Sequence, residues 1–373
     1  MSNRFQVFAR RFAFAANAVV AITYLLACLA PLLNPVKWWF ISWLGLIFPV
    51  LFVVLTISFL FWLFFRRKYA LIIFCVMLVG IKNLAVFFAF HIPKSFHHDR
   101  QPGELRIVSW NVARFVEIKK NNNKGSQTRL KIMEQLKEQD ADVLCLQEFH
   151  TSTREDYYDN ISYIQKELKY PYYYFSFDED GDKQFYSSII FSRYPFVDSG
   201  IVLYPPPALP EALLHADIVY NHDTIRIFTS HLQSLQFRKV DYTKIERIKS
   251  YEDSLIPNSK SIFSKIKKGM SYRSYQSRLL KQAIIASPHP VILCADFNDT
   301  PNSYTYFTIA KNMNDAFLQK GFGIGRTFSS LSPTLRIDYI LTSKQFSVKQ
   351  FNRVIKDYSD HYMIVADLKL PEH

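Results

Sequence analysis

Residues 291–298 read Val-Ile-Leu-Cys-Ala-Asp-Phe-Asn, an unbroken apolar run that leads into a carboxylate and an amide. A short run rich in Val, Ile and Leu predicts a buried β-strand, here over residues 291–295. Asp296 and Asn298 would then lie just past the end of that strand, at the edge of the sheet. They are the first candidates for a functional site.

Three other segments, far apart in the chain, repeat this pattern of an apolar run followed by a polar group. They are Ser109-Trp110-Asn111, Cys145-Leu146-Gln147-Glu148 and Ser359-Asp360-His361. A buried sheet would present the ends of all these strands at one edge, so the polar groups would meet there. Asn111, Glu148 and Asp360 offer amide and carboxylate oxygens, the ligands that Mg²⁺ and Ca²⁺ prefer. The sequence therefore predicts a divalent-metal site.

The long apolar stretches of the chain lie near its N-terminus. Three stretches, 12–33, 38–65 and 69–92, each exceed the roughly 20 residues that a helix needs to cross a bilayer. They predict three transmembrane helices in a membrane region of residues 1–103, followed by a catalytic domain of residues 104–373. Basic residues gather before the first stretch and between the second and third: Arg4, Arg10, Arg11, Arg66, Arg67 and Lys68. By the positive-inside rule, this multi-pass membrane protein would carry its large domain on the extracytoplasmic side.

Lys82 and Asn83 interrupt the third stretch. Polar residues inside a span are expected to line a helix interface or a polar pocket, because their exposure to lipid is costly. The alternative is that only two stretches cross the bilayer and that the third lies in its interface. That arrangement would place the large domain in the cytoplasm.

Charge and cysteine content exclude some classes of protein. The net charge is +13, but residues 1–103 hold ten Lys and Arg and one acid, so most of that charge belongs to the membrane region. The remainder holds 35 basic and 31 acidic residues and carries only +4, which gives no strong field for nucleic acid. The four cysteines form neither a disulfide framework nor a CxxC metal site, so they leave the cellular compartment open.

The rest of the sequence alternates short apolar runs with helical patterns. Helices are predicted near 128–139 and 154–168, and further strands near 105–112, 142–147, 172–177, 187–192, 213–220, 224–231, 336–342, 346–354 and 363–370. So many short strands with helical intervals predict two packed sheets with outer helices, an α+β sandwich rather than a Rossmann fold. Residues 234–273 form a basic insertion, either a solvated helical pair or a lid or membrane-surface element.

On these motifs, residues 104–370 resemble the endonuclease/exonuclease/phosphatase superfamily, which includes DNase I-like nucleases, inositol polyphosphate phosphatases and neutral sphingomyelinases. Asn111 and Glu148 match the family's first motif and its metal-binding glutamate. Residues 295–298 match the Gly-Asp-Phe-Asn motif, with Ala295 in place of the usual glycine. The resemblance implies the DNase I-like fold, a four-layer α/β sandwich of two mixed sheets between outer helices.

The resemblance also assigns a catalytic histidine and its partners. Asp338, in Arg-Ile-Asp-Tyr-Ile, matches the aspartate that pairs with the catalytic histidine. Asp360 and His361 match the terminal Ser-Asp-His motif, so His361 is that histidine. Either His361 or Asp296 would activate the attacking water, and both assignments stay open.

Two further residues would act on the phosphoryl oxygens. By the resemblance, Asn298 and His231 donate hydrogen bonds to these oxygens and so stabilise their charge. Abasic-site endonucleases of this fold have tyrosine in place of His231, which argues against that branch. A metal held by Asn111, Glu148 and Asp360 would act as a Lewis acid.

The sequence therefore predicts a membrane-anchored, metal-dependent hydrolase of phosphoester bonds (EC 3.1). Its expected cofactor is Mg²⁺, with Mn²⁺ or Ca²⁺ as alternatives, and its expected partners are the lipid bilayer and a phosphoester substrate. A phosphodiesterase acting on lipid or other small phosphoesters is preferred, and a DNase-like endonuclease or exonuclease is the alternative. An alternative of another class is a non-catalytic receptor or scaffold on the same fold. No protein partner is indicated.

Overall fold

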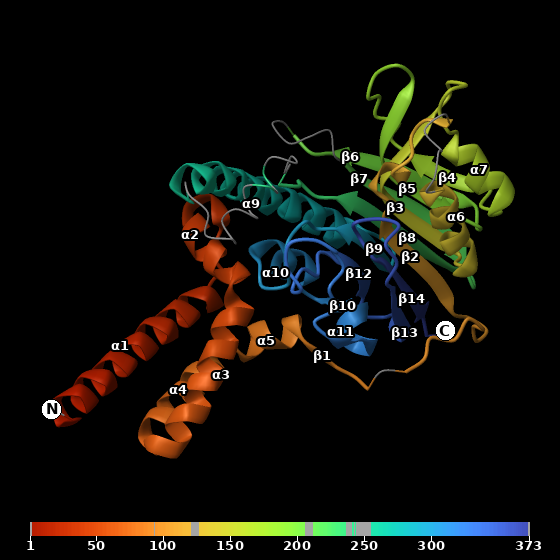
Figure 1. Ribbon diagram of the computed structural model, residues 1–373. Helices are drawn as coiled ribbons and strands as arrows, with labels where there is room; N and C mark the ends of the chain where they lie inside the picture. The colour runs from red at the N-terminus through yellow and green to blue at the C-terminus, as the bar shows by residue number, and fades with distance from the viewer. Residues whose placement is uncertain are drawn as a thin grey trace.

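The computed structural model describes residues 2–92, 94–120, 127–205, 212–235, 241, 243 and 255–371. Its N-terminal part is helical and its remainder is a sandwich of sheets and helices (Figure 1). The N-terminal helices are α1 (Ser2–Cys28), α2 (Pro35–Leu46), α3 (Phe48–Phe65), α4 (Arg67–Val79) and α5 (Ile81–Phe87).

The second apolar stretch is not one helix, so the span predicted over 38–65 starts too early and is shortened to Phe48–Phe65. The helix breaks at Ile47, and Pro49 lies in the first turn of α3. Proline lacks an amide hydrogen and its ring clashes with the preceding turn, so it kinks or breaks a helix interior but is accepted in a first turn. The apolar windows long enough to cross a membrane are Arg11–Cys28 in α1 and Phe48–Phe65, the whole of α3.

The third stretch is bent. α4 and α5 meet at 60°, so they make a third candidate span only if the bent pair counts as one. The bend lies at Gly80, where an added Cβ would fall 2.0 Å from the hydroxyl oxygen of Tyr24. The same hydroxyl donates to the carbonyl of Met77 at 3.1 Å, so α1 packs tightly into this corner. Beyond the bend, Lys82 is exposed whereas Asn83 is buried.

The helices α1, α3 and α4 pack around a small shared core that includes Tyr24, Phe48 and Trp62. Their outward faces stay apolar: 84% of Phe64 and 60% of Val50 are exposed. Soluble monomeric proteins rarely expose apolar surface of this extent. The helices are therefore suited to membrane association.

The part of the chain that follows the N-terminal helices contains two six-stranded sheets. The first has the order β13-β14-β2-β3-β5-β4, with bounds Ser347–Val354, Met363–Lys369, Leu105–Asn111, Val143–Ser152, Gln184–Ser192 and Tyr172–Phe175. The second has the order β10-β12-β9-β8-β7-β6, with bounds Met313–Asp315, Asp338–Ser343, Val291–Asp296, Asp223–His231, Ala212–Tyr220 and Phe196–Leu203. Both sheets are mixed, because β2 pairs with β3 and β8 pairs with β9 in parallel while the other pairs are antiparallel.

Both faces of the central strands are buried, which explains their unbroken apolar runs. In β9, Ile292 and Cys294 face the core between the sheets. The alternate residues Leu293 and Ala295 belong to the core beneath the outer helices of the second sheet. The α+β sandwich expected from the sequence is confirmed.

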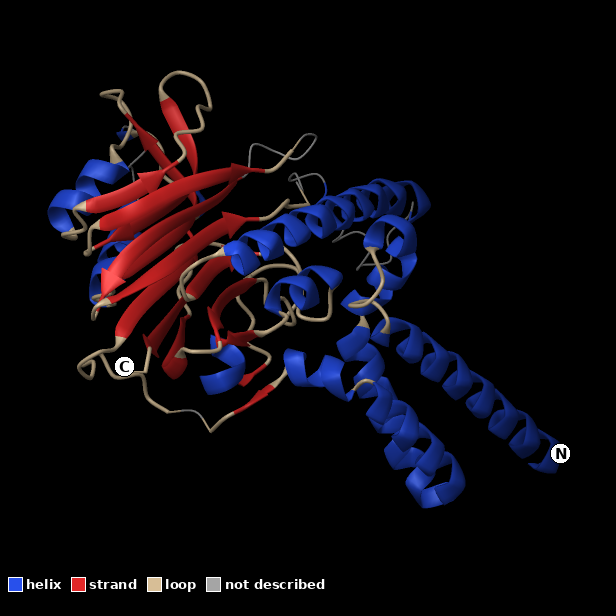
Figure 2. Cartoon of the chain, turned by 180° about the vertical axis from the view of Figure 1, so that it is seen from behind, coloured by secondary structure: helices blue, strands red, loops and turns tan. Residues whose placement is uncertain are grey.

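Helices cover the outer face of each sheet (Figure 2). Those on the first sheet are α6 (Thr128–Glu138) and α7 (Asn160–Glu167), and those on the second are α9 (Leu255–Ala286) and α10 (Tyr304–Ala310). The short helix α11 (Ala316–Lys320) lies at the edge of the sandwich, where Ala316 joins the core between the sheets and Phe317 contacts Phe351 of β13. A short 3-10 turn, η1 (Ala113–Phe115), follows β2, and a small ribbon pairs β1 (Ala89–Phe90) with β11 (Phe322–Gly323). The result is the four-layer arrangement of helices, sheet, sheet and helices.

The basic insertion predicted over 234–273 ends in helix α9. Its residues 236–240, 242 and 244–254 lie outside the described residues. The rings of Phe263 on α9 and Trp43 on α2 stack with centroids 4.0 Å apart. The ammonium of Lys267 lies 4.9 Å from the centre of the Trp39 ring. The first half of α9 therefore packs against the N-terminal helices.

Candidate active site

The predicted site residues converge at one end of the sandwich. Asn111 ends β2, and its parallel partner β3 carries Glu148. His231 and Asp296 are paired at the ends of the parallel strands β8 and β9. Asp338, at the start of the antiparallel strand β12, is aligned with Asp296. Strand direction and register thus bring groups from both sheets to one place.

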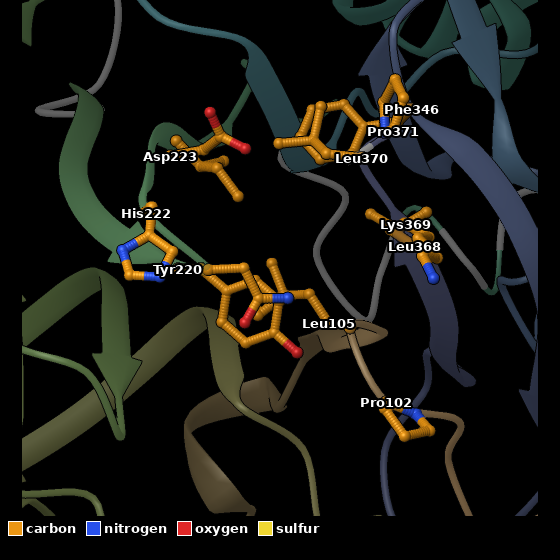
Figure 3. A pocket seen from close by; sticks show the side chains of 13 residues that line it. Pro102, Leu105, Tyr220, His222, Asp223, Phe346, Leu368, Lys369, Leu370 and Pro371 are labelled. Carbon is orange, nitrogen blue, oxygen red and sulfur yellow. The ribbon is translucent and has the colours of Figure 1, made fainter. Parts of the chain in front are cut away.

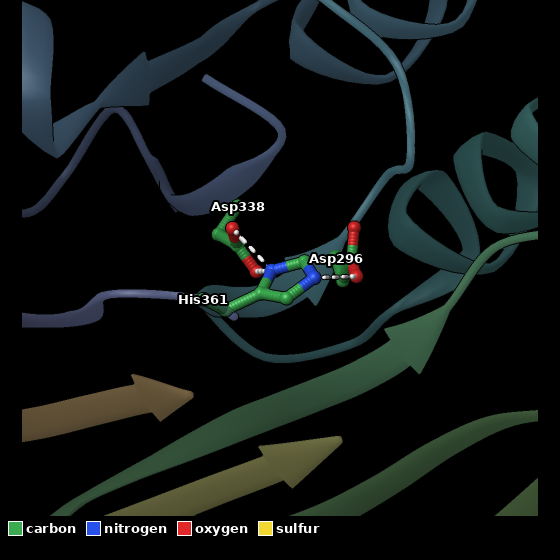
Figure 4. Close-up of side chains that lie close together, drawn as sticks. All are labelled: Asp296, Asp338 and His361. Carbon is green, nitrogen blue, oxygen red and sulfur yellow. Dashed lines mark hydrogen bonds and ion pairs between the residues drawn. The ribbon is translucent and has the colours of Figure 1, made fainter. Parts of the chain in front are cut away.

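His361 lies between two aspartates (Figure 4). Its Nδ1 is 2.9 Å from Oδ2 and 3.1 Å from Oδ1 of Asp338. Its Nε2 lies 3.7 Å from Oδ2 of Asp296. The three side chains are buried, and their ligand atoms all lie within 4.8 Å of one another. Asp338 therefore fixes the plane and tautomer of the His361 ring, and Nε2 faces Asp296.

Asp296 is also the meeting point of the other groups. Asn111 donates from Nδ2 to Asp296 Oδ2 at 3.1 Å and to Glu148 Oε1 at 3.3 Å. His231 Nε2 lies 3.5 Å from Asp296 Oδ2 and 3.8 Å from Glu148 Oε1. The Oδ1 of Asn111 accepts from the amide of Ala113 at 3.1 Å. Asn111 thus turns its nitrogen toward the acids, and it would have to rotate its amide to offer oxygen to a metal.

A β-bulge directs Glu148 into the site. The pairing of β3 with β5 shifts register between Leu146 and Phe149, and Glu148 has φ of 50°. The residues on either side are fully buried, whereas 29% of the Glu148 side chain is exposed. Bulges commonly re-aim a side chain in this way. If β3 paired regularly with β5, the Glu148 side chain would be packed in the interior like its neighbours.

The turn after β9 presents Asn298 beside the acids. Asn298 has φ of 51°, a conformation that asparagine tolerates better than most residues. Its backbone amide donates to Asp296 Oδ1 at 2.8 Å, and its Nδ2 donates to the carbonyl of Leu232 at 2.9 Å. These bonds connect the turn to the segment that follows His231.

Sequence reasoning assigned no role to three supporting residues. Ser359 Oγ donates to the carbonyl of Asn111 at 2.8 Å and accepts from the His361 amide at 3.2 Å. Trp110 Nε1 donates to the His361 carbonyl at 2.8 Å. Ser359 and Trp110 lie inside the motifs that end in His361 and Asn111, so their position in the sequence could have pointed to a supporting role. Thr327, which accepts from the amides of residues 337 and 338, lies in a loop with no local signal.

A cavity of about 270 Å³ opens at this site. Its lining combines polar groups, among them Glu148, Asn298, Asp360 and His361, with apolar groups such as Leu331 and Leu335. A larger cavity of about 580 Å³ lies at the opposite end of β2, lined by Tyr220, His222, Asp223 and Lys369 among others (Figure 3). None of the predicted site residues lines that second cavity, so the smaller one is the candidate active site.

The acids repel one another, which fits a bound cation. Burial and then the neighbouring Asp338 carboxylate raise the pKa of Asp296. Loss of surrounding water, and then the Glu148 and Asp296 carboxylates, raise the pKa of Asp360. Burial alone would lower the pKa of His361, but Asp338 and Asp296 outweigh it and raise that pKa to about 10. A divalent ion on Glu148 and Asp360 would relieve the carboxylate repulsion, so this oxygen donor set fits the predicted metal.

The fold and the site define a class of protein. Residues 108–361 match the endonuclease/exonuclease/phosphatase family, and the chain belongs to that family. Its members are hydrolases of phosphoester substrates and generally use divalent metal ions. The apolar region matches separately, over residues 10–87, a domain of unknown function. No curated protein matches the chain.

Solved structures agree on the fold. A humanized TDP2 of D. rerio with 14 mutations is 20% identical, with a TM-score of 0.50 over 72% of this chain and 99% of that one. The human nocturnin catalytic domain with bound sulfate is 18% identical, with a TM-score of 0.50 over 73% and 96%. At these identities the likeness establishes the DNase I-like fold.

Proposed function

We propose that this chain is a membrane-anchored, metal-dependent phosphodiesterase that hydrolyses lipid or other small phosphoesters. The observation that carries the proposal is the convergence of carboxylates and imidazoles on one open cavity. Glu148, Asp360 and His361 line this cavity. Asp296, Asp338 and His231 lie directly behind them, in contact with His361 or Glu148. A scaffold that had lost catalysis would have no need to keep the buried Asp296 and Asp338 beside the more open Glu148 and Asp360, since like charges repel one another.

His361 is assigned the role of a cationic donor. With a pKa of about 10 it is protonated at neutral pH, and its Nδ1 is occupied by Asp338. Its Nε2 would donate to a phosphoryl oxygen and stabilise the negative charge that grows there. Because a protonated ring cannot accept a proton, we assign removal of the proton from the attacking water to Asp296. The raised pKa of Asp296 makes its carboxylate a better base for this step.

The remaining groups hold the substrate and the ion. Glu148 and Asp360 would bind the divalent ion, Mg²⁺ in the first instance, with Asn111 as a third ligand once its amide is rotated. When bound, the ion supplies Lewis-acid stabilisation of the phosphoryl oxygens. His231 and Asn298 would donate to the non-bridging oxygens from the opposite side.

The N-terminal helices support an extracytoplasmic domain. α4 packs along α3 through ring pairs such as Phe59–Phe74, 6.0 Å apart, which favours a bundle over a helix lying in the interface. In Figure 1, the N-terminus and the turn between α3 and α4 point away from the sheets. Arg66, Arg67 and Lys68 occupy that turn. The positive-inside rule assigns that end to the cytoplasm and the sheets to the other side of the bilayer.

Charge and position together favour a lipid or small substrate over nucleic acid. Residues 104–373 carry only +4, whereas binding to a nucleic acid backbone depends on many cationic contacts. The loop that follows Asp296 contacts the N-terminal helices, since Asn302 bonds to Asn83. The site would thus lie close to lipid headgroups.

The test uses the full chain, purified in mild detergent with Mg²⁺, Mn²⁺, Ca²⁺ or EDTA. Its substrates are bis-p-nitrophenyl phosphate, sphingomyelin, phosphatidylinositides and plasmid DNA, and the comparison proteins are His361→Ala and the control His222→Ala from the distant cavity. We expect metal-dependent cleavage that His361→Ala loses and His222→Ala retains. Faster cleavage of DNA than of every lipid would reassign the protein as a nuclease. A folded sample inactive on all substrates would favour the scaffold alternative.

A further inference from the structure

The short helix α5 joins the N-terminal helices to the catalytic region through buried polar contacts. Asn83 on α5 is 6% exposed and donates from Nδ2 to Asn302 Oδ1 at 2.6 Å. The same nitrogen donates to the carbonyl of Cys28, at the end of α1, at 3.2 Å. Asn302 is 1% exposed and donates to the carbonyl of Ala27 at 3.5 Å. A buried amide pair is costly unless it is satisfied, so these partners specify one arrangement.

Asn302 belongs to the loop that carries the site. It follows Asn298 by four residues, and the segment between them is held at both ends. Within that segment, Asp299 accepts from Thr305 Oγ1 at 2.8 Å and pairs with Arg273 of α9 at 3.3 Å. Packing around Asn302 is tight, because a Cβ on Gly45 of α2 would lie 2.8 Å from its carbonyl oxygen.

A second contact joins α5 to the strand that orients the catalytic histidine. Arg336 donates from Nη2 to the carbonyl of Val86 on α5 at 2.7 Å. Its Nη1 pairs with Asp315 at 2.7 Å, and its side chain is 1% exposed. Arg336 precedes Asp338 by two residues, and Asp338 holds the His361 ring.

The two contacts belong to one buried network. The hydroxyl oxygen of Tyr339 lies 2.9 Å from the carbonyl oxygen of Asp299 and 2.7 Å from that of Arg336, so its one proton is shared between these two acceptors. Movement of α5 would therefore act on the loop after β9 and on the start of β12 together. α5 is itself fixed to α4 by the bend at Gly80, where Tyr24 of α1 fills the corner.

We infer that the N-terminal helices form a structural part of the active site as well as its anchor. Asn83 and Val86 on α5 are positioning residues: through Asn302 and Arg336 they hold Asn298 and Asp338 in their working geometry. Displacement of a catalytic group by about 1 Å can lower the rate on the order of 100-fold. A small movement transmitted through these contacts would therefore be enough to change turnover. The inference rests on the proposed hydrolase function and deepens it. It predicts that the state of the N-terminal helices regulates the rate of hydrolysis.

The test is a double-mutant cycle in the full chain with Asn83→Leu, Asn302→Leu and the double variant. Leucine is branched at the same carbon as asparagine, and each single change leaves one buried amide without its partner. Replacing both removes the amide pair, so the double variant should lose less stability than either single variant. Its remaining cost is that the Cys28 and Ala27 carbonyls lose a donor. The readouts are the thermal midpoint, and kcat and KM for bis-p-nitrophenyl phosphate. Thr56→Val, which removes a hydroxyl of α3 that bonds within its own helix, is the matched control.

We expect kcat to fall about tenfold or more in both single variants and in the double variant, with KM changed less than twofold. The double variant should regain part of the thermal midpoint that the single variants lose, without regaining kcat. If kcat returns with the midpoint, the pair serves stability alone and the inference is wrong. Wild-type kcat in the single variants would equally overturn it.

A second measurement covers the case in which the leucine variants do not fold. In Asn83→Ser, which retains a short polar side chain, hydrogen exchange of residues 297–303 and 336–340 should rise at least tenfold over wild type. Exchange of the distant strand β5 should not change. Unaltered exchange in the site segments would refute the inference. Hydrogen exchange is measured without substrate. It therefore distinguishes a missing connection between α5 and the site from an incorrect assignment of the hydrolase function.

Discussion

Replacement of Asp338 by asparagine tests the electrostatics of the site most sharply. The pKa of His361 rises from its ordinary 6.5 to about 10 in the folded chain, against the lowering effect of burial and chiefly through Asp338. Each pKa unit corresponds to about 1.4 kcal/mol, so the rise represents roughly 5 kcal/mol of stability below pH 6.5 and about 4 kcal/mol at pH 7. Breaking a buried ion pair by removing one partner costs about 3–5 kcal/mol. We expect Asp338→Asn to lose stability in that range at pH 7.

The sign of the pH dependence follows from the same shift. Because the pKa of His361 is higher in the folded than in the unfolded chain, the protonated ring stabilises the fold. This contribution is complete below about pH 6.5 and is lost as the pH rises toward 10. The difference in unfolding free energy between wild type and Asp338→Asn should therefore shrink between pH 7 and 10.

The assay is urea unfolding of the full chain in mild detergent with EDTA, followed by circular dichroism at several pH values. Asp198→Asn is the control, because it removes an exposed carboxylate 3.4 Å from His215. That variant should match wild type closely at every pH. A difference between wild type and Asp338→Asn that stays constant from pH 7 to 10 would refute the assigned pairing.

Three further outcomes are expected. His231→Ala should reduce kcat about 100-fold, as removal of a transition-state donor does, with the thermal midpoint within a few degrees of wild type; an unchanged kcat would exclude the role. Burial lowers the pKa of His150, so its protonation opposes folding as the pH falls below about 6.5. His150→Gln should therefore lose less stability than wild type between pH 7 and 5, and parallel unfolding curves would contradict this. Mg²⁺ at about 100-fold above its dissociation constant should stabilise the wild type by roughly 2.7 kcal/mol, and calorimetry of Glu148→Gln should show most of that gain lost.

Much of the fold could be predicted because the central strands are buried on both faces. The run at 291–295 is apolar without alternation because the two faces of β9 pack into two different hydrophobic cores. The polar groups after such runs were predicted to meet, and the register of β8, β9 and β12 brings His231, Asp296 and Asp338 together. Position at a strand end is therefore a strong signal in this fold.

Other features depend on tertiary packing that local sequence does not encode. The bulge that turns Glu148 outward arises from the pairing of β3 with β5, and its residues carry no distinguishing pattern. Asn83 could be placed at an interface, but its partner Asn302 lies 219 residues away. The break at Ile47 was missed although Pro49 marks it, because hydropathy gave more weight to the apolar run than to the proline.

The most direct measurement of the central claim is the rate of bis-p-nitrophenyl phosphate hydrolysis by the full chain, with Mg²⁺ and with EDTA, for wild type and His361→Ala. The site predicts turnover that requires the ion and that falls by at least 100-fold in the variant. Turnover of equal rate in EDTA, or in folded His361→Ala, would contradict the assignment of this site as the catalytic centre.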